Sequence, residues 1–209
     1  MINHKTGFWA SVGAATFTFI FGISMFFDTE MFSYLISIFI SFSFIMLASA
    51  FESISDNKVK VFANTGLSFA IVYAVYINMV YFSQLTVVRL MAESSDVINA
   101  LKYQPGSWMF MIDLIGYGFL ALSTFFLGLT LKPERRSDKW LKVLLMVHGI
   151  FAITSFILPA IDMAGMSESP SGAMDFGILA LLFWCVIFIP IMALSASFFR
   201  YQKTWKTQK

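Results

Sequence analysis

Ionisable side chains inside apolar runs are the residues of this sequence most able to do chemistry. Asp113 is the one charged residue in Trp108–Leu131, a run of 24 residues. An ionisable group inside a bilayer is costly, so it is usually protonated, paired with another group, or facing a polar cavity. Such a carboxyl group can attract a cation or exchange a proton. Asp113 is therefore the first candidate for a ligand-binding or proton-titrating residue.

Other polar residues are expected at a similar depth, near the outer ends of neighbouring spans. Asn78 and Tyr81 stand close to the end of the preceding apolar run, and Tyr117 follows Asp113 by one helical turn. Asp162 and Asp175 are expected where the last two spans meet the outer surface. Together with Asp113, these residues predict a polar pocket that opens outward.

Each of these residues also has a structural interpretation. Asp113 can be hydrogen-bonded to Asn78 or to a tyrosine and simply hold two helices together. An asparagine within a span often joins helices in the same way. Asp162 and Asp175 fit equally well as acidic residues at helix N-termini, which the helix dipole favours.

His148 is the only histidine inside an apolar run. A histidine within the membrane can relay protons or bind a metal, and it can equally form a hydrogen bond to a neighbouring helix. A metal site normally needs several ligands. His4 stands at the N-terminus and Cys185 in a different run, so we expect no metal site and no cofactor.

Composition defines the class of protein to which these residues belong. Of 209 residues, 58% are hydrophobic and only 12% are charged, against about 25% charged in soluble domains. Runs of about 20 apolar residues are long enough to cross a bilayer as helices. The sequence predicts an all-α integral membrane protein, a single bundle of six transmembrane helices without a soluble domain. The expected spans are about 8–27, 31–51, 61–82, 108–131, 140–161 and 174–199.

The distribution of basic residues predicts the orientation. With the N-terminus in the cytoplasm, twelve of the fourteen lysines and arginines lie in cytoplasmic segments, as the positive-inside rule requires. Both termini are therefore expected to be cytoplasmic, in a plasma membrane, and we expect a bacterial inner membrane. Basic residues beside a membrane attract anionic lipid. The residues expected to contact it are Arg135, Arg136, Lys139, Lys142, Arg200, Lys203 and Lys206.

Two classes of function fit this pattern. The first is a small transporter or ligand-binding membrane protein that uses the pocket around Asp113. The second is a non-catalytic helper or sensor that acts through contacts with proteins or lipid. A lipid-modifying enzyme is a distant third class: the carboxyl groups allow it, but the sequence has no paired nucleophile, no nucleophile elbow, no His-Glu-x-x-His and no phosphate-binding glycine loop. The sparse basic residues flank the spans, which argues against nucleic-acid binding.

Overall fold

The computed structural model describes residues 2–27, 29–90, 96–104, 107–160 and 176–207. These residues form helices and short connections. A 3₁₀ turn, Asn57–Val59, precedes α3, and a single π-helical turn, Gln84–Val88, extends it. The helices are α1 (Ile2–Ser24), α2 (Glu30–Ile54), α3 (Lys60–Ser83), α4 (Asp96–Leu101), α5 (Trp108–Thr130), α6 (Arg136–His148), α7 (Ile150–Ala160) and α8 (Phe176–Thr207).

Six helical segments are long and apolar enough to cross a membrane, which confirms the predicted all-helical class. α1, α2, α5 and α8 each supply one segment. α3 supplies another, together with the short turns at its two ends. α6 and α7 together supply the fifth segment in chain order, Arg136–Ile157.

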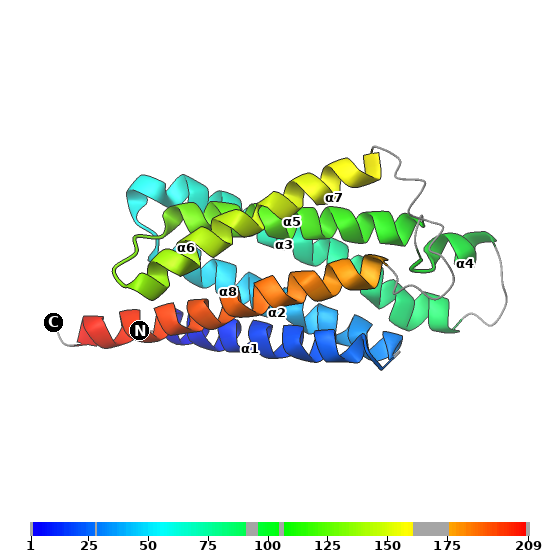
Figure 1. The fold of residues 1–209 in the computed structure, drawn as a ribbon, viewed down its shortest axis with the longest axis horizontal. Helices are drawn as coiled ribbons and strands as arrows, with labels where there is room; N and C mark the ends of the chain where they lie inside the picture. The colour runs from blue at the N-terminus through cyan, green and yellow to red at the C-terminus, as the bar shows by residue number, and fades with distance from the viewer. Residues whose placement is uncertain (1, 28, 91–95, 105–106, 161–175, 208–209) are drawn as a thin grey trace.

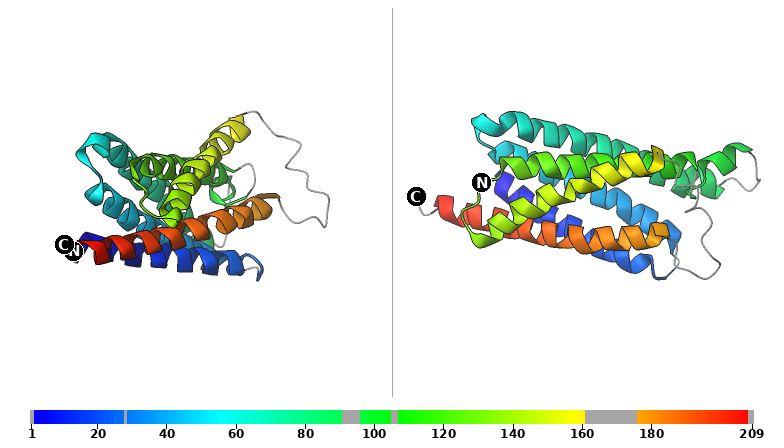
Figure 2. Two further views of the ribbon diagram at one scale, coloured as in Figure 1. Left: turned by 60° about the vertical axis from the view of Figure 1, so that its left-hand side comes forward. Right: turned by 45° about the horizontal axis from the view of Figure 1, so that its top comes forward.

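The helices pack side by side along one long axis (Figure 1). α1 lies between α2 and α8, α2 packs on α3, and α3 packs on α5. α6 closes the bundle because it contacts both α5 and α8. The two termini lie at one end, and α4 lies at the opposite end (Figures 1 and 2).

The expected fifth span is two helices rather than one, because the chain turns at Gly149. The backbone N–H of Gly149 donates to Met146 at 3.1 Å, and that of Ala152 donates to Gly149 at 3.1 Å. A side chain at position 149 would place its Cβ 2.8 Å from Cβ of Phe125, so the turn needs a glycine. Beyond the turn α7 follows α5 and leans away from α8 (Figure 2).

Serine and threonine hydroxyls in the spans are mostly paired within their own helix. Ser11 donates to the carbonyl of Gly7 and Thr18 to that of Ala14, both at 2.7 Å. Ser123 is an exception, because its hydroxyl donates to the carbonyl of Gly66 at 2.6 Å and so joins α5 to α3. These two helices approach closely there. A Cβ at position 66 would lie 2.9 Å from Leu127 Cγ.

Candidate functional site

Asp113 lies in the second turn of α5, and its side chain is turned into the bundle. The residue is only 2% exposed. Its Oδ2 accepts a hydrogen bond from the Tyr103 hydroxyl at 2.9 Å. Tyr103 belongs to the connection between α4 and α5 rather than to a span. The carboxyl group is therefore covered from the end of the bundle where α4 lies.

The backbone on either side of Tyr103 is fixed by one buried side chain. Gln84, 6% exposed, stands at the start of the π-helical turn that extends α3. Its Nε2 donates to the carbonyl of Leu101 at 2.8 Å, and its Oε1 accepts from the backbone N–H of Tyr103 at 3.0 Å. Ser107 caps α5 and also accepts, at 3.3 Å, from the N–H of Gln104. These bonds hold the Tyr103 hydroxyl over Asp113.

Five of the seven tyrosines of the chain surround the Asp113 side chain. Tyr103 donates the 2.9 Å hydrogen bond, the Tyr81 hydroxyl also interacts with the carboxyl group, and the other three lie within electrostatic range of it. They come from α2, α3, α5 and the connection before α5. We call this set the tyrosine cluster, and its members are Tyr34, Tyr73, Tyr81, Tyr103 and Tyr117.

The rings of the tyrosine cluster also contact each other. Tyr34 stacks on Tyr81 with centroids 5.4 Å apart, and Tyr103 lies 6.0 Å from both rings. Tyr73 and Tyr117 form a second pair, 6.2 Å apart. The rings thus form two contacting groups, and the first group contains Tyr103, the hydrogen-bond donor to Asp113.

The other carboxylate oxygen of this residue, Asp113 Oδ1, is buried and has no hydrogen-bond partner among the described residues. The ion pairs formed in the described part of the chain also leave Asp113 out. Buried charged groups in proteins are normally paired and hydrogen-bonded. Asp113 therefore combines burial with an incomplete set of hydrogen-bond partners.

The structure brings some of the predicted site residues together and separates others. Tyr81 and Tyr117 adjoin Asp113, as expected from their depth. Asn78 does not bond to Asp113, because its amide donates to Ser41 Oγ at 2.9 Å and to the carbonyl of Ala74 at 2.7 Å. It joins α3 to α2 instead. The expected positions of Asp162 and Asp175 lie outside the described residues.

His148 ends α6 just before the turn at Gly149, and both of its ring nitrogens have partners. The indole N–H of Trp184 donates to Nε2 at 3.1 Å, so Nε2 is the unprotonated nitrogen. Nδ1 then carries the hydrogen and donates to Thr124 Oγ1 at 2.8 Å. The Thr124 hydroxyl donates in turn to the carbonyl of Ala121. This network assigns a neutral histidine that links α6 to α5 and α8, which matches the structural interpretation.

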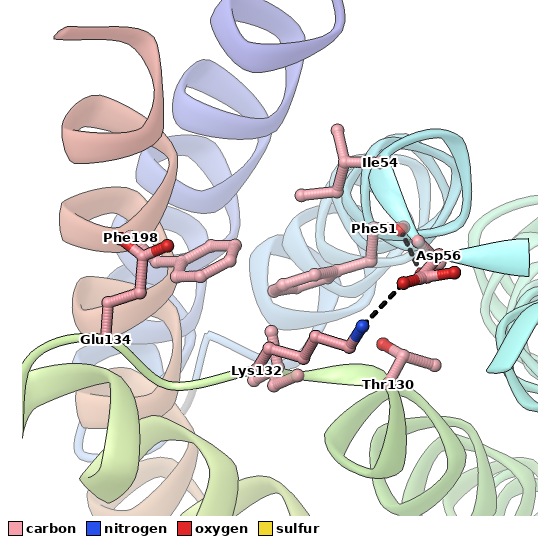
Figure 3. Close-up of a pocket in the computed structure, with 9 residues that line it drawn as sticks. Phe51, Ile54, Asp56, Thr130, Lys132, Glu134 and Phe198 are labelled. Carbon is pink, nitrogen blue, oxygen red and sulfur yellow. Dashed lines mark hydrogen bonds and ion pairs between the residues drawn. The ribbon is translucent and has the colours of Figure 1, made fainter. Parts of the chain in front are cut away.

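A pocket of about 350 Å³ lies at the opposite end of the bundle from Asp113. Its wall includes the rings of Phe51 and Phe198, and Lys132 reaches across it to pair with Asp56 (Figure 3). The hydrogen bond from Lys132 holds the pKa of the Asp56 carboxyl below its usual value. The pocket also contains Glu134, so both signs of charge line it. Nothing in the sequence indicated this pocket, because its residues come from the α2–α3 and α5–α6 connections, the ends of α2 and α5, and α8.

The basic residues expected to contact lipid fall into two groups. Arg135 pairs with Asp138 at 2.8 Å and lies 4.1 Å from the centre of the Tyr201 ring, and Lys142 donates to the carbonyl of Leu131. Arg136 and Lys139, by contrast, are exposed on α6. Arg200 is also exposed, and the side chains of Lys203 and Lys206 lie outside the described part of the structure.

This bundle has the architecture of a multi-pass membrane protein, and its buried polar centre is Asp113 in the tyrosine cluster. Comparison with known protein families, with curated proteins and with solved structures finds no match to the chain.

Proposed function

We propose that the chain is a small transporter or ligand-binding protein of a plasma membrane, and that its ligand binds at Asp113 from the outer side. The observation that carries this proposal is the buried Oδ1 of Asp113, which has no hydrogen-bond partner among the described residues. A polar group left incomplete in a protein interior costs about 1–3 kcal/mol. A ligand that completes its hydrogen bonds recovers part of that cost.

The position of Tyr103 supports access from the outer side. Its hydroxyl bonds to Asp113, but its backbone belongs to a connection outside the spans. Moving residues 102–104 away would break the bonds of Tyr103 to Asp113 and Gln84 and those between Gln104 and Ser107, none of which is a backbone bond within a spanning helix. Under this proposal, Tyr103 covers the site and moves when the ligand binds.

One observation favours the alternative, a helper or sensor with no ligand at Asp113. The Asp113 side chain is only 2% exposed and already has one hydrogen bond. A carboxylic acid that only joins the α4–α5 connection to α5 would form this same bond. The two functions differ in one respect, because only a binding protein must open this site to water.

Cysteine accessibility distinguishes the two functions. In a Cys185→Ser background, Tyr117→Cys places a thiol one turn below Asp113, within the tyrosine cluster. Leu120→Cys is the matched control, because Leu120 is fully buried on the same helix and lies outside the cluster. In intact cells we expect a membrane-impermeant thiol reagent to label position 117 slowly and position 120 not at all. A thiol at position 117 that stays unlabelled would overturn the proposal and favour the helper.

The proposal also includes the orientation and the lipid contacts expected from the sequence. Both termini are cytoplasmic, the membrane is a bacterial inner membrane, and anionic lipid binds the basic cytoplasmic end. Exposed Arg136 and Lys139 are the best placed for this contact. Arg135 is already paired with Asp138, so it contributes less.

A further inference from the structure

We infer that the ligand of the Asp113 site is a small protonated amine. This inference rests on the proposed function and adds the chemical class of the ligand. Three properties of the site carry it: the charge that the site lacks, the donor that Oδ1 needs, and the aromatic rings that surround the carboxylate.

The first property is charge. Asp113 is 2% exposed, and no lysine or arginine of the described residues forms an ion pair with it. A carboxyl group inside a bilayer is normally protonated, paired, or facing a polar cavity. A cationic ligand would pair with the ionised form of the carboxyl group, whereas an anion would be repelled by it.

The second property is the free acceptor. The Tyr103 hydroxyl occupies Oδ2, and Oδ1 has no donor within the described residues. An ammonium group carries N–H donors in a compact, strongly charged head. A charge-assisted hydrogen bond from such a group to Oδ1 would complete the carboxylate. A quaternary ammonium ion has no N–H group and so cannot form this bond.

The third property is the tyrosine cluster. The face of a tyrosine ring attracts a lysine-type ammonium group as well as the quaternary ammonium groups that bind in aromatic cages. The cluster provides five rings from four parts of the chain around one carboxylate. The same rings accept the apolar part of an amine.

A metal ion suits these residues less well than an amine. Hard cations such as Ca²⁺ and Mg²⁺ need at least six oxygen ligands, with carboxylates and waters among them. The described residues contain no group of three or more His, Cys, Asp or Glu side chains that would hold a metal. Around Asp113, the other oxygen donors are tyrosine hydroxyls, which are weak ligands when protonated.

The test uses the full chain in detergent and measures Tm in the presence of paired probes. Ethylamine, butylamine and benzylamine are each compared with the alcohol of the same carbon skeleton, and sodium chloride is the metal-ion control. We expect at least one amine to raise Tm in a saturable way and its matched alcohol to have no effect. Asp113→Asn keeps the size of the side chain and removes its charge, so it should weaken amine binding at least tenfold.

Asp96→Asn is the matched control variant, because Asp96 is an exposed aspartate on α4, at the same end of the bundle. It should leave amine binding unchanged. The inference is overturned if no amine raises Tm, if the alcohols or sodium act as strongly as the amines, or if the amine effect survives in Asp113→Asn. When Tyr117→Cys is labelled and yet no amine binds, the proposed function stands and only the ligand class is refuted.

Discussion

Replacing Tyr103 by phenylalanine tests whether the hydrogen bond from the Tyr103 hydroxyl to Asp113 stabilises the folded chain. The substitution removes one hydroxyl group and keeps the ring contacts with Tyr34 and Tyr81. It also keeps the backbone bond to Gln84, because that bond uses the N–H of residue 103. The change therefore isolates the 2.9 Å hydrogen bond to Asp113.

The expected loss follows from burial on the two sides of this bond. A buried polar group that loses its partner costs about 1–3 kcal/mol, and hydrogen bonds between membrane helices average about 0.6 kcal/mol, with a maximum near 1.7. Asp113 is 2% exposed, which favours the upper part of these ranges, and the nearby Tyr81 hydroxyl compensates for part of the loss. Tyr103 is half-buried, which reduces the cost. We expect Tyr103→Phe to lower the free energy of unfolding by about 1–2 kcal/mol.

The assay is a double-mutant cycle measured by reversible unfolding in mixed micelles. Its second substitution is Asp113→Leu, which removes the acceptor. In that background the Tyr103 hydroxyl has already lost its partner, so Tyr103→Phe should cost nothing or stabilise. Asp113→Asn retains an acceptor oxygen and should preserve most of the cost. Tyr76→Phe is the control, since Tyr76 stacks on Phe119 and its hydroxyl has no bond among the described residues, so we expect a change below about 0.5 kcal/mol.

The coupling between the two positions decides the outcome. Independent sites add to within about 0.3–0.5 kcal/mol. A coupling energy below that limit would refute the description of Tyr103 as the group that completes Asp113. The site would then be open in solution, or another group would bond to the carboxylate.

Four further predictions concern other parts of the chain. Trp184→Phe and Thr124→Val each leave one ring nitrogen of buried His148 without a partner, so each should lower the unfolding free energy by about 1–3 kcal/mol in chemical denaturation. Arg135→Gln should lower Tm because it removes the ion-pair partner of buried Asp138. The double variant Arg136→Gln, Lys139→Gln changes two exposed residues, so it should reduce binding to anionic vesicles and leave Tm unchanged. The hydrogen bond from Lys132 lowers the pKa of Asp56, so the ionised Asp56 side chain stabilises the fold at neutral pH and loses this effect when acid protonates it. The unfolding curves of Asp56→Asn and the wild type should therefore converge below about pH 4. In a Cys185→Ser background, an impermeant thiol reagent should label Lys102→Cys but not Glu134→Cys in intact cells, and the reverse would invert the topology.

The helices could be predicted from the sequence because a bilayer demands long apolar runs. The run around Asp113 was expected at 108–131 and forms α5 over Trp108–Thr130. The expected span 140–161 showed no break, since Gly149 is a single glycine in an apolar segment. The requirement for it comes from Phe125 on another helix, which no local pattern reveals.

The partners of Asp113 could be predicted only in part, for a physical reason. In a membrane, the face of a helix that meets lipid is as apolar as the face that meets other helices, so hydropathy does not fix rotation about the helix axis. Asn78 has the right depth but turns to Ser41. Tyr103 lies outside the apolar runs, so it was not among the residues predicted for the site. The sequence feature that could have indicated this contact is a tyrosine, Tyr103, placed a few residues before the span that contains Asp113.

The pairing of hydroxyls inside their own helices has a consequence for how the chain is made. α1 and α2 carry most of their hydroxyl groups already bonded to carbonyls of the same helix, so each can enter the bilayer without waiting for a neighbour. α5 cannot do so, because Asp113 and Ser123 find their partners on Tyr103 and Gly66. We therefore expect biogenesis to separate into insertion, which the serine-rich helices can complete alone, and docking, in which α5 gains its partners on α3 and residue 103.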